Sequence, residues 1–146
     1  MPMEIPEAMK EEHEEFHKEL AKATKIQGNV GEAAKRVALV LHPHFEKENE
    51  LALPVIGLAR ELAEGKTSPD FPKALKLCET FKREYEKMLQ EHVEIVKALD
   101  ELKKVAKTAN EKDVIEFTKK LKLHAQTEED LTYPAVLMIG KLLKET

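Results

Sequence analysis

The sequence predicts an all-α protein, an up-down-up-down four-helix bundle built from two repeated helical hairpins. Three observations support this fold class. The composition is that of helices, because aromatic residues make up only 5% of the chain, Trp is absent, and Ala, Leu, Glu and Lys abound. Turn-forming segments divide the chain into four long stretches. The inward-facing pattern of the first two stretches then recurs in the last two.

Three breaks separate the predicted helices. Segments 27–31 and 65–72 carry Gly, Pro, Asn and Ser, and a shorter break lies at 108–110, where Asn110 is placed to cap a new helix. We therefore expect helices near residues 6–26, 31–63, 70–107 and 111–144, within a single domain spanning 1–146. Short connections between long helices favour antiparallel neighbours.

The inward face of the second helix recurs in the fourth, 80 residues later, with spacings that alternate between four and three. In the second helix this seam consists of Val37, Leu41, His44, Glu48, Leu51, Val55, Leu58 and Leu62. In the fourth it consists of Phe117, Leu121, His124, Glu128, Leu131, Ala135, Met138 and Leu142. The first and third helices repeat at a separation of 79, where Met9, His13, Phe16 and Leu20 match Met88, His92, Ile95 and Leu99. Each copy thus carries one His and one His-x-x-x-Glu.

Polar residues on this seam indicate a metal site. They are His13, His44, Glu48, His92, His124 and Glu128. A buried carboxylate must be paired or bound to metal, and residues four apart share one helix face, about 6 Å apart along the axis. Two His-x-x-x-Glu pairs and one His from each remaining helix could therefore surround two cations, with both carboxylates free to bridge them. Imidazole and carboxylate suit iron, manganese or zinc. The alternative is a set of buried ion pairs and core histidines, which chance would have to place alike in both copies.

The chain resembles the haemerythrin-like, or HHE cation-binding, family in four segments that span nearly the whole domain. These are Glu12-His13-Glu14-Glu15-Phe16, His44-Phe45-Glu46-Lys47-Glu48 with Pro54, Glu91-His92-Val93-Glu94-Ile95, and His124-Ala125-Gln126-Thr127-Glu128-Glu129 with Tyr133-Pro134. The resemblance implies a four-helix bundle around two non-haem iron ions, bridged by oxide or hydroxide, that bind O₂ or related small ligands. It further implies single-histidine ligands His13 and His92, terminal ligands His44 and His124, and bridging Glu48 and Glu128.

The sequence departs from the oxygen-carrying members of that family in two places. Those members have a further histidine one turn before His92, where this chain has Met88, and a helix-four carboxylate at the position of Glu129. The internal repeat favours Glu128, and Glu129 stays open as the bridge. One metal would then lack a ligand, which puts reversible O₂ carriage in question. Tyr85 could donate an oxygen, and His17 could replace the histidine, but we expect core packing for Tyr85 and a surface or supporting position for His17.

The rest of the composition limits the partners. There is no basic block for nucleic acid, and no apolar run approaches the roughly 20 residues that span a bilayer. The N-terminus lacks the plan of a signal peptide, and the single Cys78 excludes an intramolecular disulfide. We expect a cytoplasmic protein without nucleic-acid or membrane partners. Its oligomeric state is not indicated.

Three functions fit the predicted metal site. The favoured one is reversible binding of O₂, NO or peroxide for storage or sensing. The second is turnover of peroxide or NO by an oxidoreductase, and the third is metal buffering or regulation without catalysis. The seam offers no spare carboxylate as a general acid, which disfavours catalysis, so whether the chain is an enzyme stays open.

Overall fold

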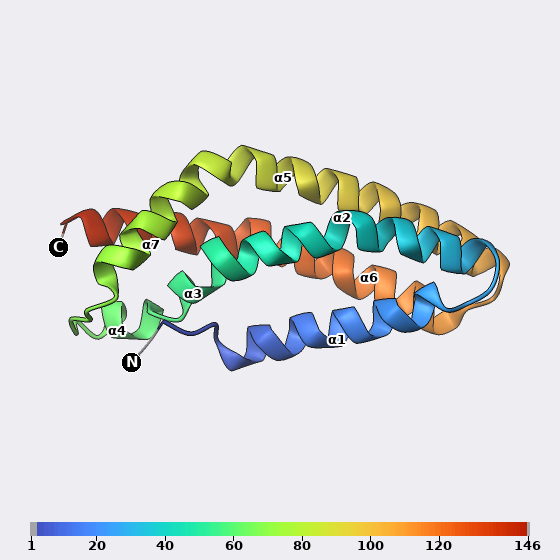
Figure 1. Ribbon diagram of the computed structural model, residues 1–146, viewed down its shortest axis with the longest axis horizontal. Coiled ribbons are helices and arrows are strands. Elements are labelled where there is room, and N and C mark those ends of the chain that lie inside the picture. Colours follow the sequence, from blue (N-terminus) through green and yellow to red (C-terminus); the bar gives the residue numbers. More distant parts are fainter. Residues whose placement is uncertain (1–2, 146) are drawn as a thin grey trace.

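The computed structural model describes residues 3–145 as a bundle of long helices (Figure 1). Its elements are α1 (Glu7–Thr24), α2 (Asn29–Leu51), α3 (Leu53–Ile56), α4 (Ala59–Ala63), α5 (Phe71–Thr108), α6 (Lys112–Thr127), the π-helical turn η1 (Glu128–Thr132) and α7 (Tyr133–Glu145). No strand occurs among these residues, so the predicted all-α class is confirmed. Residues 1, 2 and 146, which the predicted domain includes, lie outside the described range.

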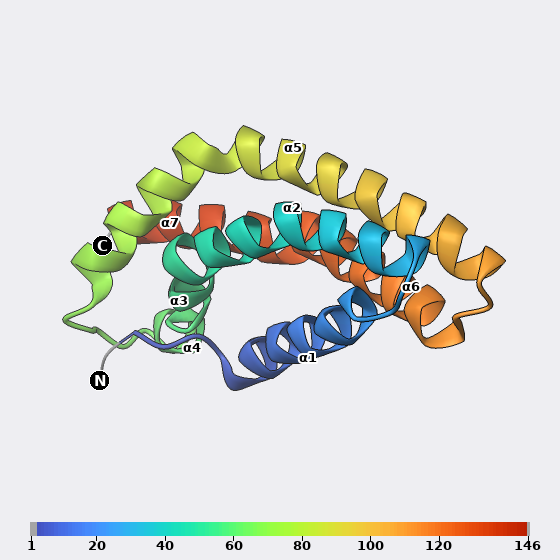
Figure 2. The ribbon, with the colours of Figure 1, turned by 45° about the vertical axis from the view of Figure 1, so that its right-hand side comes forward.

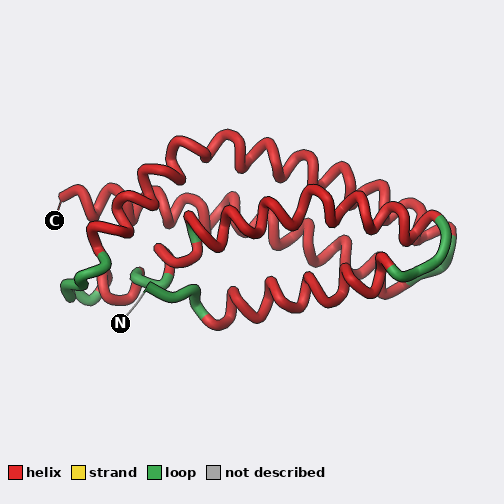
Figure 3. The backbone as a smooth tube through the Cα atoms, viewed as in Figure 1, coloured by secondary structure: helices red, strands yellow, loops and turns green. Residues whose placement is uncertain are grey.

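The helices run up and down between two ends at which the loops gather (Figure 3). The α1–α2 and α5–α6 connections lie at one end, and the connection from α4 to α5 lies at the other, together with both chain ends. Helix α5 bows along α2 in both ribbon views (Figure 2). Between residues 3 and 145, no helix combines the length and apolar character needed to cross a bilayer.

Asn110 ends α5 instead of capping the next helix, so the predicted capping role is wrong. Its φ of 59° lies in the left-handed region, which Asn tolerates better than most residues. The Asn110 N–H donates to the Lys107 carbonyl at 3.2 Å, and the Glu111 N–H donates to the Ala106 carbonyl at 2.9 Å. These two bonds satisfy carbonyls that the end of α5 would otherwise leave unpaired. Helix α6 begins without a side-chain cap.

Two apolar clusters fill the bundle, one on each side of the polar seam residues. The cluster toward the α1–α2 loop includes Phe16, Leu41, Ile95, Phe117 and Leu121. The cluster toward the other end includes Val55, Phe81, Met88, Tyr133 and Val136. The histidines and glutamates of the seam therefore lie in a polar layer between two apolar ones, where little water can reach them.

The second and fourth helices are not continuous, which corrects the prediction of unbroken helices over 31–63 and 111–144. Helix α2 ends at Leu51, and the chain continues through the short helices α3 and α4. The fourth helix contains η1, in which the Tyr133 N–H donates to the Glu128 carbonyl five residues earlier. Pro54 and Pro134 lie just after these interruptions. Proline has no N–H to donate, and its ring crowds the carbonyl four residues back.

The π-helical turn changes which face of the fourth helix is buried. Leu131, Met138 and Leu142 are 67%, 63% and 50% exposed, so their predicted place on the inward seam is wrong. The turn adds one residue to the helix, and every later residue shifts around the axis. The residues that face inward are instead Thr132, Tyr133, Val136, Ile139, Gly140 and Leu143.

A pair of alanine substitutions tests this register. Val136→Ala should lower the free energy of unfolding by about 2 kcal/mol, because it removes two buried methyl groups and leaves a cavity. Met138→Ala, only two residues away, should change it by less than about 0.5 kcal/mol, because Met138 is exposed. Urea unfolding of both variants measures the two values. The opposite order would mean that the fourth helix continues without the shift.

Candidate metal centre

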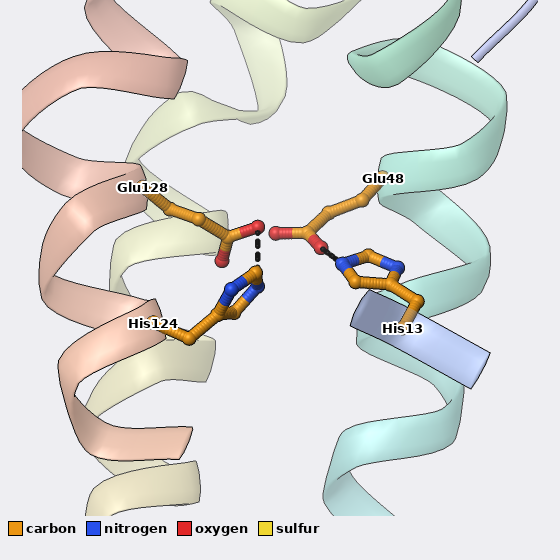
Figure 4. A group of neighbouring side chains, drawn as sticks. All are labelled: His13, Glu48, His124 and Glu128. Carbon is orange, nitrogen blue, oxygen red and sulfur yellow. Dashed lines mark ion pairs between the residues drawn. The ribbon is translucent and has the colours of Figure 1, made fainter. Parts of the chain in front are cut away.

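The structure brings the six polar residues of the seam together in the polar layer. They come from the four long helical stretches of the bundle. Helix α1 contributes His13 and α2 contributes His44 and Glu48. Helix α5 contributes His92, while the fourth helix contributes His124 in α6 and Glu128 in η1. Figure 4 shows His13, Glu48, His124 and Glu128, whose polar ends point toward one another. Glu48 is 0% exposed and Glu128 is 2% exposed, so both carboxylates lie deep in the bundle.

The donor atoms form two groups that share both glutamates. One group comprises His13, Glu48, His124 and Glu128, and the other comprises His44, Glu48, His92 and Glu128. Within each group the donor atoms lie within 4.8 Å of one another. Such an arrangement offers two adjacent positions for cations.

Each glutamate directs one oxygen toward each group. Glu48 Oε1 lies 3.5 Å from His13 Nε2, and Glu48 Oε2 lies 3.1 Å from His44 Nε2. A carboxylate placed in this way can bridge two cations, because each of its oxygens faces a different histidine.

Glu128 repeats this arrangement on the opposite side of the layer. Its Oε2 lies 3.2 Å from His124 Nε2, and its Oε1 lies 3.2 Å from His92 Nε2. Each glutamate therefore places one oxygen beside a histidine of each donor group, as the internal repeat of the sequence predicts.

Several of these atoms face one another without forming hydrogen bonds. Glu48 Oε1, Glu128 Oε1 and His124 Nε2 are buried and have no hydrogen-bond partner, although histidine or carboxylate atoms lie within 3.5 Å of each. Buried polar atoms without partners are costly, and a cation in each donor group would satisfy them: one group contains Glu48 Oε1 and His124 Nε2, and Glu128 Oε1 faces the other. The donor set of imidazole and carboxylate thus fits a divalent or trivalent metal.

Two further carboxylates orient two of the histidines. Glu12 Oε1 forms an ion pair with His124 Nδ1 at 2.7 Å, and Glu91 Oε1 accepts a hydrogen bond from His44 Nδ1 at 2.7 Å. Lys47 Nζ in turn donates to Glu91 Oε2 at 2.7 Å. With the proton held on Nδ1, each imidazole presents Nε2 to the centre, as metal-binding histidines commonly do. Glu12 and Glu91 directly precede His13 and His92, 79 residues apart, but sequence analysis did not predict this role.

The two buried carboxylates influence each other, and their pKa values shift in opposite directions. Burial and the neighbouring Glu128 charge raise the pKa of Glu48 to about 8. Burial alone would also raise the pKa of Glu128, but the imidazoles of His124 and His92, 3.2 Å from its two oxygens, hold it well below its usual range. Without a metal, the layer therefore keeps one carboxylate protonated and the other charged at neutral pH.

The pKa values of His13 and His124 also shift in opposite directions. Burial, together with the positive charge of His124, lowers the pKa of His13 to about 4. Burial opposes protonation of His124 as well, yet the Glu128 carboxylate outweighs it and raises the pKa of His124 to about 9. In the metal-free protein, His124 thus carries a charge that a bound cation would replace.

Tyr133 is a member of the centre that sequence analysis missed. Its hydroxyl donates to Glu48 Oε2 at 2.5 Å and lies 3.0 Å from both His44 Nε2 and His92 Nε2. Burial and the charges of the two glutamates raise the pKa of this phenol above its usual range. The available signal was the neighbouring Pro134, because a proline removes a backbone hydrogen bond and marks a place where a helix can be interrupted.

The remaining candidates lie outside the two groups. Glu129 is one-third exposed, and its Oε1 lies 3.7 Å from His92 Nδ1, behind the ring, so Glu128 is the glutamate that faces the centre. His17 stacks on the exposed His42 with ring centroids 4.8 Å apart. Tyr85 packs against aromatic rings, as expected. Met88 is fully buried in the apolar cluster beside Tyr133.

Two surface grooves end at histidines of the centre. A groove of about 390 Å³ between α1 and α6 is lined by Glu12, Phe16 and His124 among others. Another of about 250 Å³ between α5 and α6 is lined by His92 and Glu129 among others. A third groove of about 400 Å³ lies around Cys78 and Gly140, and none of the six seam residues lines it. Surface grooves thus border the outer edges of two histidines of the centre, His124 and His92.

The stability of the metal-free protein should fall as the pH rises from 6.5 to 9. The folded-state pKa values of Glu48 and His124, about 8 and about 9, lie above the ordinary values of 4.5 and 6.5. Both groups thus stabilise the fold at low pH and lose this contribution as the pH passes through the folded values. Melting temperatures from circular dichroism should decrease over this window, by about 3 °C for each kcal/mol lost.

Glu48→Gln should flatten this dependence, because the amide stays neutral, whereas Glu46→Gln on the exposed face should not. A melting temperature that rises toward pH 9, or equal slopes in both variants, would contradict the assigned shifts.

Comparison with known proteins agrees with this geometry. A family model described as Hemerythrin HHE cation binding domain matches residues 4–136, which include all six seam residues and Tyr133. Searches of curated proteins and of solved structures gave no match. With nine-tenths of its length matched, the chain belongs to the haemerythrin HHE cation-binding domain family.

Proposed function

We propose that the chain is a non-haem di-iron protein that binds O₂, NO or peroxide reversibly, for storage or sensing. The observation that carries this proposal is the pair of donor groups that share Glu48 and Glu128. A single cation would occupy only one of the two matched donor groups. The free thiol of buried Cys78 is consistent with a reducing compartment such as the cytoplasm.

In the proposed centre, His13 and His124 hold one iron, and His44 and His92 hold the other. Glu48 and Glu128 bridge them, since each directs one oxygen to each group. Imidazole and carboxylate suit iron, and they also suit manganese and zinc. Membership of a cation-binding family supports a metal here, and the resemblance to haemerythrins favours iron.

The protein around the proposed centre would select ligands by their size and polarity. Apolar clusters above and below the polar layer exclude water, and the grooves at His124 and His92 give small ligands an approach. Two histidines and two shared glutamates leave each six-coordinate ion short of donors, so bound iron would supply the positions at which a small ligand binds. The buried layer suits a diatomic molecule or peroxide better than a larger substrate.

Metal content tests the first part of the proposal. Protein reconstituted with iron should contain two irons per chain by elemental analysis. Glu48→Ala should lower this content, because it removes an oxygen from each donor group. His17→Ala should retain two irons, because His17 stacks on His42 outside both groups. Saturation at one iron, or at none, would overturn the paired site.

The same iron-loaded samples test the second part. Azide, NO or peroxide should change the visible absorption spectrum of the wild-type protein and of His17→Ala. A spectrum that ignores all three ligands would contradict small-ligand binding and favour metal buffering. Multiple turnovers of peroxide or NO per chain would favour an oxidoreductase over reversible binding.

A further inference from the structure

Tyr133 reaches the centre because of the π-helical turn. The turn moves the inward face of the fourth helix by one residue, so that Tyr133 lies inside and Leu131 lies outside. The Tyr133 ring is fully buried and packs edge-on against Phe81 and Tyr85, with ring centroids 5.2 and 6.3 Å apart. This packing fixes the position of the hydroxyl oxygen in the layer.

Three donor atoms around one of the two groups form an equilateral triangle. The distances between His44 Nε2, His92 Nε2 and Tyr133 Oη are 3.0 Å along all three sides. Donors at right angles on a metal at about 2.1 Å are about 3.0 Å apart, whereas tetrahedral donors at that distance are about 3.4 Å apart. The triangle therefore has the size of one face of an octahedral metal site.

When His44 is neutral, as a metal ligand must be, its Nε2 has a lone pair that can bind a cation. Its Nδ1–H donates to Glu91, which leaves Nε2 without a proton. The single proton of the Tyr133 hydroxyl is directed to Glu48 Oε2 at 2.5 Å. In the metal-free layer, hydrogen bonds connect Tyr133 Oη to His44 Nε2 and His92 Nε2 at 3.0 Å, which is also the spacing of ligands that share a cation.

The other group has no equivalent oxygen. The position 80 residues before Tyr133 is Leu53, which is buried but cannot coordinate a metal. Met88 stands one turn before His92, where the oxygen-carrying relatives have a further histidine, and it lies in the same apolar cluster as Tyr133. The tyrosine thus lies on the side of the centre at which a histidine is missing.

We propose that Tyr133 binds the metal held by His44 and His92 through its phenolate oxygen. This inference rests on the proposed metal centre and adds an oxygen ligand to it. On metal uptake the phenol O–H bond breaks, an oxygen–metal bond forms, and the proton is released to solvent. The centre is then asymmetric, and the metal held by His13 and His124 keeps more positions for exogenous ligands.

Spectroscopy of the ferric protein tests the assignment, with Tyr85→Phe as the matched control. Wild type and Tyr85→Phe should both show a phenolate-to-iron charge-transfer band in the visible, with resonance-enhanced tyrosinate ring modes in the Raman spectrum. Tyr133→Phe should lose the band and the modes. Circular dichroism checks that Tyr133→Phe stays folded, which the retained ring favours.

Proton release supplies a second readout that does not depend on iron. Zinc uptake at pH 7, followed with an indicator dye, should release about one proton fewer per chain from Tyr133→Phe than from Tyr85→Phe. Two irons bound without tyrosinate modes in the wild type, or equal proton release from both variants, would overturn the Tyr133 assignment and leave the di-iron proposal standing. Failure of the wild type to bind metal would overturn both.

Discussion

Glu48 and Glu128 meet in the middle of the bundle, and the rest of the structure depends on how their charge is accommodated. Both carboxylates are almost fully buried, and each lies within about 3.5 Å of two imidazole nitrogens. Two carboxylates at this depth cannot both be ionised without a cation, which is why the pKa of Glu48 is raised to about 8 while that of Glu128 is lowered. A pair of metal ions would allow both carboxylates to ionise.

The supporting carboxylates connect the two hairpins to each other. Glu12 on α1 orients His124 of the second hairpin, and Glu91 on α5 orients His44 of the first. Helix α1 thus contacts α6 of the second hairpin, and α5 contacts α2 of the first hairpin. The exchange ties the repeat of the sequence to the packing of the bundle, since neither hairpin can complete its own half of the centre. Lys47, which has Thr127 as its counterpart, strengthens only the Glu91 side.

Sequence reasoning predicted the bundle and the six residues because both depend on a simple period. Spacings of three and four locate the inward face of a helix as long as the helix is regular. They succeeded up to Glu48 and Glu128, and they failed beyond Glu128, where Leu131, Met138 and Leu142 are exposed. The helix there is not regular, because a proline follows, and the added residue of a π-helical turn has no signature in the hydrophobic pattern.

The same failure concealed Tyr133. On an unbroken helix this residue would lie off the seam, so its hydroxyl was not counted among the donors. Asn110 was misread for a related reason, since Asn favours both the start of a helix and the left-handed residue after one, and only the backbone distinguishes the two. Tyr133 and Asn110 are thus placed by local backbone geometry, which the spacing of apolar residues does not reveal.

We propose that two metals lie side by side and share Glu48 and Glu128. Anomalous diffraction at the iron edge from crystals of the iron-loaded protein measures their positions directly. We expect two peaks about 4 Å apart or closer, one beside His13 and His124 and the other beside His44 and His92, with both glutamates between them. A single peak, or peaks away from the two glutamates, would contradict it.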